Sequence, residues 1–192
     1  MLSNTNCYYE DKTPWIDRIK FVTEKGLDAL VETNMQRWFT EGFRKRAPET
    51  IERMRKAFVA TKVPGYIACC EAIRDMDFRA SNPSIKAPTL VIVGAQDPAT
   101  PPSAGEAIQK AITGAKLASL DAAHISNVEQ PSQFTPIVLN FLRGARPRGG
   151  LILERAKPAK CTPLVRAEIA QKCWPVVRPT MVAASVISGD AF

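Results

Sequence analysis

One short run of residues limits the fold of this chain more than any other feature. Thr89 to Gly94 reads TLVIVG, an uncharged run rich in β-branched side chains. Such a run predicts a strand buried on both faces, as in parallel sheets that helices cover. A second strand is predicted over AKLASLD, residues 115–121, after a helix that Ser103 opens as part of a capping box. We therefore expect an α/β protein.

Residues before the first predicted strand read as helices. Apolar side chains recur at helical spacing through residues 13–78 and predict four helices, the first capped by Thr13. A last helix is predicted to follow the second strand, with Pro136 inside it as a weak point. Cys69 and Cys70 share one helical face and are expected to act as small apolar packing groups.

Composition excludes several classes of protein. The chain has five cysteines but no C-x-x-C pair and a single histidine, so we expect no zinc site, no disulfide framework and a reducing, cytoplasmic location. No stretch has the length and apolarity of a membrane span or of a signal peptide. The net charge of +7 comes almost entirely from residues 143–192, which hold 9 basic and 3 acidic residues. That tail has no nucleic-acid motif, so nucleic acid is not expected as a partner.

Two residues at strand ends carry the chemistry. Asp97 follows the first predicted strand and His124 follows the second, and functional groups in open α/β sheets gather beyond the carboxyl ends of the strands. A carboxylate on one nitrogen of a histidine fixes its tautomer, so that the other nitrogen can take a proton from a serine. Each residue alone also has a structural interpretation, Asp97-Pro98 as a turn and His124 as an ordinary imidazole. Their order and strand context together favour the acid and base of a catalytic triad.

The nucleophile of such a triad is not found in this sequence. Hydrolases of this kind place it in a G-x-S-x-G turn ahead of the acid, and no such motif occurs in the 192 residues. The nearest match, around Ser103, lacks the first glycine, follows the acid and is better explained as a helix cap.

Several segments resemble 3-oxoadipate enol-lactonases of the α/β-hydrolase family. They occur in the family's order and cover residues 2–143: LSNT, RWFTEGFR, GYIACCEAIRDMD, PTLVIVGAQDPATPP and DAAHISNVEQP. The resemblance implies hydrolysis of 3-oxoadipate enol-lactone, a step of aromatic-acid breakdown, through a serine acyl-enzyme and without a metal or organic cofactor. It also implies that LSNT ends a sheet strand, and that Arg37 and Trp38 contact the substrate. There is an alternative to substrate contact for each residue: Trp38 packs within the apolar stripe of its own helix, and Arg37 lies on a solvated face.

The resemblance divides the chain into four parts. Residues 1–12 are expected to be a remnant after a sheet strand, 13–80 a helical lid, 81–143 the last part of the α/β-hydrolase core with Asp97 and His124, and 144–192 an irregular basic tail. Three hypotheses follow. In the first, the chain is an incomplete enol-lactonase that is inactive alone, either a truncated gene product or one half of a split enzyme that an N-terminal hydrolase fragment completes. In the second, it is a fragment of another, esterase-like hydrolase. In the third, it is a non-catalytic interaction module with a basic tail.

Overall fold

A small parallel sheet lies at the centre of the fold. The computed structural model describes residues 1–144, and it contains a three-stranded sheet in the order β1 (Leu2–Ser3), β2 (Leu90–Gly94), β3 (Lys116–Leu120). All pairs are parallel, with Leu2 opposite Val91 and Leu90 opposite Lys116. The α/β prediction is confirmed, and β2 lies in the middle of the sheet as its uncharged sequence requires.

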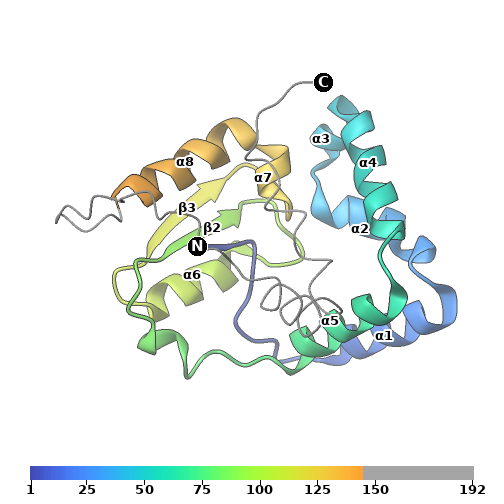
Figure 1. Cartoon of the computed structure of the whole chain (residues 1–192), viewed down its shortest axis with the longest axis horizontal. Helices are drawn as coiled ribbons and strands as arrows, with labels where there is room; N and C mark the ends of the chain where they lie inside the picture. The colour runs from blue at the N-terminus through green and yellow to red at the C-terminus, as the bar shows by residue number, and fades with distance from the viewer. Residues whose placement is uncertain (145–192) are drawn as a thin grey trace, which may run out of the picture. The chain divides into compact units, whose positions relative to one another are not determined.

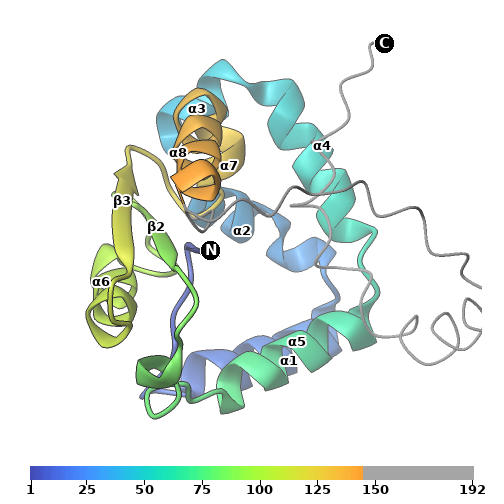
Figure 2. The same cartoon turned by 60° about the vertical axis from the view of Figure 1, so that its left-hand side comes forward.

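Helices cover both faces of this sheet (Figures 1 and 2). Val91 and Val93 pack against α6 (Pro102–Ala111), on Ile108 and on Ile112, which directly follows the helix. Side chains of the opposite face pack on α8 (Pro131–Gly144). The alternation of β2 side chains therefore builds two separate cores, which join α6 and α8 to the sheet.

The segment between β1 and β2 is helical. It contains α1 (Thr13–Lys25), the 3-10 turn η1 (Asp28–Leu30), α2 (Val31–Trp38), α3 (Glu41–Arg46), α4 (Pro48–Val59), α5 (Val63–Asp75) and the 3-10 turn η2 (Asn82–Ser84). Helices α1 to α5 share an apolar core of their own, and α1 and α5 run side by side in both views. This helical layer occupies the residues for which the sequence predicted a lid, and we refer to it as the lid segment, or lid.

Three local predictions were wrong. The lid segment has five α-helices and not four, because Thr40 caps a short additional helix, α3, whose single buried apolar residue Phe43 gives no periodic signal. Thr13 is not a cap: it is the first residue of α1, and its amide donates to Asp11 Oδ1 at 2.9 Å. Ser103 is not a cap either, because α6 already begins at Pro102. Proline is favoured at the first position of a helix.

Pro136 does not interrupt α8, which runs continuously to Gly144 (Figure 1). The short helix α7 (Ser126–Glu129) precedes it. The basic tail predicted for residues 144–192 lies, apart from Gly144, outside the described residues. Within residues 1–144, no helix has the length and apolarity needed to cross a bilayer, and no cluster of side chains is suited to bind a metal ion.

Candidate active site

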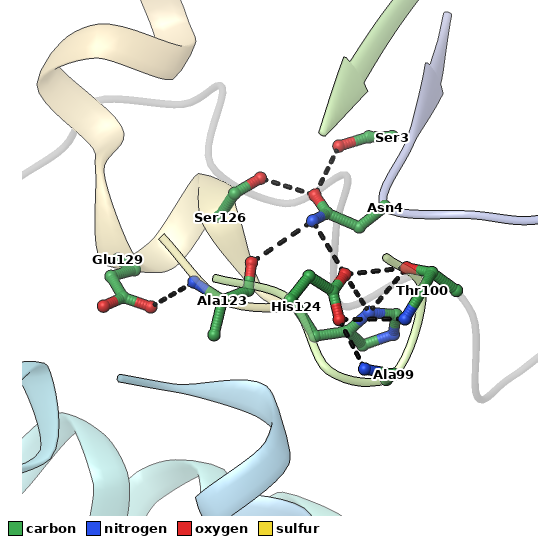
Figure 3. Close-up of polar contacts among 9 residues, drawn as sticks. Ser3, Asn4, Ala99, Thr100, Ala123, His124, Ser126 and Glu129 are labelled. Atoms are coloured by element: carbon green, nitrogen blue, oxygen red, sulfur yellow. Dashed lines mark hydrogen bonds and ion pairs between the residues drawn. The ribbon is translucent and has the colours of Figure 1, made fainter. Parts of the chain in front are cut away.

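Asp97 and His124 meet where the loops after β2 and β3 leave the sheet. Figure 3 shows His124 with Thr100 and Ala99 beside it. His124 Nδ1 lies 2.8 Å from Asp97 Oδ2. The Asp97 side chain is fully buried, whereas 23% of the His124 side chain is exposed. Among residues 1–144, no hydrogen bond is made by His124 Nε2, which leaves that nitrogen open to a reacting group.

Asp97 is held as a carboxylate. Burial by itself raises the pKa of this carboxyl, but hydrogen bonds from His124 and Thr100 outweigh burial and lower the pKa to about 2. The amides of Ala99 and Thr100 donate to Oδ1 at 2.8 and 3.0 Å, and the Thr100 hydroxyl donates to Oδ2 at 2.7 Å. An ionised carboxylate only accepts, so the contact with His124 is donated by Nδ1–H, and Nε2 is the nitrogen left to exchange a proton with a reacting group.

Asn4 links the end of β1 to both loops (Figure 3). Its Nδ2 donates to Asp97 Oδ2 at 3.1 Å and to the Ala123 carbonyl at 3.2 Å, and its Oδ1 accepts from the Ser126 hydroxyl at 2.6 Å. Asn4 is in the left-handed region, with φ of 46°, a conformation that asparagine tolerates better than most residues. This side chain therefore fixes the acid loop and the histidine loop relative to one another.

Gly94 permits the close approach of these loops. A Cβ atom at this position would collide with the Ala123 carbonyl oxygen, and would lie 2.6 Å from the carbonyl oxygen of Ala122. No side chain fits there. The glycine that precedes Asp97 by three positions is thus required by the backbone that leads to His124.

Glu129 connects the histidine loop to the lid. Its buried carboxylate accepts from the Ala123 amide at 3.1 Å, and from both the amide and the hydroxyl of Thr40. On the other side of His124, the Ile125 amide donates to the Trp38 carbonyl at 3.0 Å. The residues before and after His124 are thus both bonded, directly or through Glu129, to lid residues 38–40.

A cavity of about 290 Å³ opens in front of His124, between the lid and the loops of the sheet. This is near the lower end of the range for small-molecule pockets, roughly 300–1,000 Å³. Arg37 and Trp38 both line it, so Arg37 does not lie on a purely solvated face. The Trp38 ring also packs edge-on against Phe58, with centroids 5.4 Å apart, so it is both cavity wall and part of the lid core.

Tyr9 is a cavity residue that sequence reasoning missed. Burial and the negative charge of Asp97 raise the pKa of this phenol, against the opposing charge of Arg37 and a hydrogen bond with Asn6. Tyr9 is therefore a neutral donor at physiological pH, and it lies within electrostatic reach of both Asp97 and Arg37.

The two cysteines and Ser103 lie in different places. Cys69 and Cys70 line the cavity from α5 in addition to packing in that helix, and burial raises the pKa of the Cys70 thiol, which keeps it protonated. Ser103 is exposed in the first turn of α6 and is not among the residues that line the cavity.

Sequence reasoning also missed Asn4, Thr100 and Glu129. Thr100 had a usable signal, since an Asp side chain often closes a turn by bonding the backbone two residues on, and Thr100 adjoins the turn that Asp97 would close. Asn4 and Glu129 act through contacts 93 and 89 residues away along the chain, and no local pattern announces such contacts.

A parallel sheet with helices on both faces, an acid after one strand and a histidine after the next define the last part of an α/β-hydrolase. No family model matches the chain. Two 3-oxoadipate enol-lactonases of Acinetobacter baylyi are similar to it. One is 38% identical over 138 residues, which are 72% of this chain and 52% of that enzyme. The other is 33% identical over 129 residues, which are 67% of this chain and 48% of that enzyme.

A solved structure agrees with these relatives. The crystal structure of the enol-lactonase from Burkholderia xenovorans LB400 is 38% identical, with a TM-score of 0.72 over 73% of this chain and 54% of that one. The chain thus spans about half the length of the curated relatives that it matches. It belongs to the α/β-hydrolase family as a partial fold, and its relatives within that family include 3-oxoadipate enol-lactonases.

Proposed function

We propose that residues 1–144 supply the acid, the base and the lid of a 3-oxoadipate enol-lactonase, and that the nucleophilic serine comes from a polypeptide segment outside these 192 residues. The observation that carries this proposal is the contact of 2.8 Å between buried Asp97 and His124, with His124 at the wall of a cavity. The sequence similarity to the two Acinetobacter enzymes supports the choice of reaction.

His124 acts first as a base. Its Nε2 takes the proton of the serine hydroxyl as the serine oxygen attacks the lactone carbonyl, and the charge of Asp97 stabilises the resulting imidazolium. The ring C–O bond then breaks, and the enol oxygen leaves with the proton from His124. His124 next removes a proton from water as the water oxygen attacks the acyl-enzyme, and it returns this proton to the serine oxygen as the acyl C–O bond breaks. The released acid is an enol, which tautomerises to the ketone.

The cavity suits a small anionic substrate. Arg37 offers a guanidinium that can bind a carboxylate, and Trp38 offers a flat apolar wall. The product of this reaction is 3-oxoadipate, an intermediate of aromatic-acid breakdown by the β-ketoadipate pathway. Acid-base and nucleophilic groups suffice for this chemistry, so the mechanism includes no metal or organic cofactor. The free thiols of Cys7, Cys69 and Cys70 favour a reducing compartment such as the cytoplasm.

Two assays test the proposal. The isolated chain should not hydrolyse the enol-lactone. A chimera that joins residues 1–144 to the part of the 38% identical Acinetobacter enzyme that they do not match should hydrolyse it, and His124→Ala in the chimera should abolish the activity. A folded chimera that cleaves simple uncharged esters but not the lactone would replace this proposal with an esterase. Full activity of the isolated chain would contradict the absence of the nucleophile.

A further inference from the structure

Arg18 has no part in the proposed mechanism, yet it lines the same cavity. Its Nη1 donates to Asn34 Oδ1 at 3.1 Å and to the Tyr66 hydroxyl at 2.9 Å, and its guanidinium lies 5.8 Å from the centre of the Trp15 ring. These partners come from α1, α2 and α5, so three lid helices hold the guanidinium in one place.

The positive charge of Arg18 has no opposite charge beside it. Both of its hydrogen-bond partners are neutral, and among residues 1–144 no carboxylate lies within 4 Å of Arg18 or of Arg37. Of the described residues, those that line the cavity include these two arginines and no Asp or Glu. A partly enclosed cation without a counter-charge is a strong site for an anion, because little water is left to screen it.

Asn34 supplies an independent observation. Only 1% of this residue is exposed, and it lines the cavity. Its Oδ1 is used by Arg18, but its Nδ2 has no hydrogen-bond partner in the described residues. A buried donor without a partner destabilises the fold, because it has lost its hydrogen bond to water and gained none in return. A ligand oxygen would satisfy it.

Tyr66 adds a third donor. Its hydroxyl oxygen accepts from Arg18, so its own proton can be donated either to the Cys70 sulfur, whose pKa a hydrogen bond with Tyr66 lowers, or to a ligand in the cavity. Burial raises the pKa of the Cys70 thiol and the charge of Arg18 lowers it, whereas the charge of Arg37 lowers the pKa of Tyr9 and that of Asp97 raises it. The two arginines thus influence different groups: Arg37 influences Tyr9, which is also close to Asp97, and Arg18 influences Cys70 of α5.

We propose that Arg18, Asn34 Nδ2 and the Tyr66 hydroxyl form a carboxylate-binding subsite in the lid, which holds the acid group of a small organic acid while its other end reaches His124. This inference rests on the proposed function only for the identity of the reacting end. It makes Arg18, and not Arg37, the main anchor of the ligand carboxylate.

Calorimetric titration of the full chain with adipate tests this subsite, because binding requires no nucleophile. Arg18→Met should weaken adipate binding about 10- to 100-fold, the usual range for a charge-assisted hydrogen bond to a carboxylate. Tyr66→Phe removes a single oxygen and should weaken binding about 3- to 10-fold. Lys20→Met, on the exposed side of the same helix, is the matched control and should leave binding unchanged. Dimethyl adipate, which has no charge, should bind at least 10-fold more weakly than adipate.

Circular dichroism of each variant verifies that it is folded. If Arg18→Met does not fold, the effect of Tyr66→Phe on adipate binding tests the subsite instead. The proposal is overturned if adipate does not bind at millimolar concentration, if the diester binds as well as the acid, or if only Arg37→Met weakens binding. An inactive chimera together with normal adipate binding would reject the proposed reaction and keep the subsite. An active chimera whose KM for the lactone is unchanged by Arg18→Met would reject the subsite and keep the proposed reaction.

Discussion

His124 Nδ1 and Asp97 Oδ2 lie 2.8 Å apart although 27 residues separate them in the chain. Parallel pairing of β2 and β3 produces this contact, because it brings the carboxyl ends of both strands to one edge of the sheet. The pair is complete within the described residues. The contribution of this pair to stability can therefore be measured on the isolated chain.

The first prediction concerns stability in acid. Asp97 has a pKa of about 2 in the folded chain and an ordinary value of 3.8 when unfolded. Its contribution is complete above pH 4 and is lost as the pH falls through 2, because only the unfolded state binds the proton in that window. The contribution is about 2 kcal/mol at a little under 1.4 kcal/mol per pKa unit. Urea denaturation between pH 2 and 5 measures it.

Asp97→Asn should remove this dependence, whereas Asp17→Asn, an exposed carboxylate on α1, should leave it in place. An unchanged acid dependence in Asp97→Asn would show that the carboxyl is not held as the hydrogen bonds indicate.

The second prediction concerns Gly94. Gly94→Ala places a methyl group against the carbonyl oxygens of Ala122 and Ala123, so the histidine loop must move. We expect a loss of about 3 kcal/mol in the free energy of unfolding, the upper end of the usual range for overpacking with backbone shifts. Gly65→Ala is the matched control, because its Cβ would meet nothing within 4 Å and it lies in helix α5, where alanine is favoured by about 0.5–1 kcal/mol. Equal effects of the two substitutions would argue against the close approach.

The third prediction separates two roles of Asn4. Asn4→Gly removes the side-chain bonds to Asp97, Ala123 and Ser126 but keeps the left-handed backbone free of strain, whereas Asn4→Ala adds the strain. The glycine variant should lose about 1–3 kcal/mol, and the alanine variant about 1 kcal/mol more. Thermal and urea denaturation of both variants give the difference. If glycine restored wild-type stability, the side-chain bonds would contribute nothing.

The sequence was sufficient for some of these features and insufficient for others. The uncharged run ending at Gly94 predicts β2, and the strand context of Asp97 and His124 predicts that they approach each other, because parallel strands leave little choice. Helix ends were less predictable: Thr13 and Ser103 have the chemistry of caps, but Pro14 and Pro102 determine where α1 and α6 begin.

Contacts between distant segments were beyond sequence reasoning. Arg18 reads as one more charge on an amphipathic helix, and only the packing of α1 against α5 brings it to Tyr66. Glu129 belongs to a recognisable E-Q-P segment, yet its role depends on Thr40, 89 residues earlier. Such long-range pairs follow from tertiary packing, which the local periodicity of one sequence does not encode.

The last prediction is that Glu129 positions His124 through the lid. Its carboxylate holds the Ala123 amide and Thr40 together, so Glu129→Ala leaves the buried Ala123 amide without a partner and releases the loop from the lid. We expect a loss of about 2–3 kcal/mol in stability, and broadened or doubled imidazole signals in NMR spectra. His124 is the only histidine of the chain, so these signals need no assignment. Glu129→Gln keeps the shape and one acceptor oxygen and should largely restore a single sharp signal, while Glu24→Ala, on the exposed face of α1, should change nothing. A destabilised Glu129→Ala variant with unaltered His124 signals would reduce Glu129 to a structural group, since loss of stability alone does not demonstrate that the carboxylate acts on the histidine.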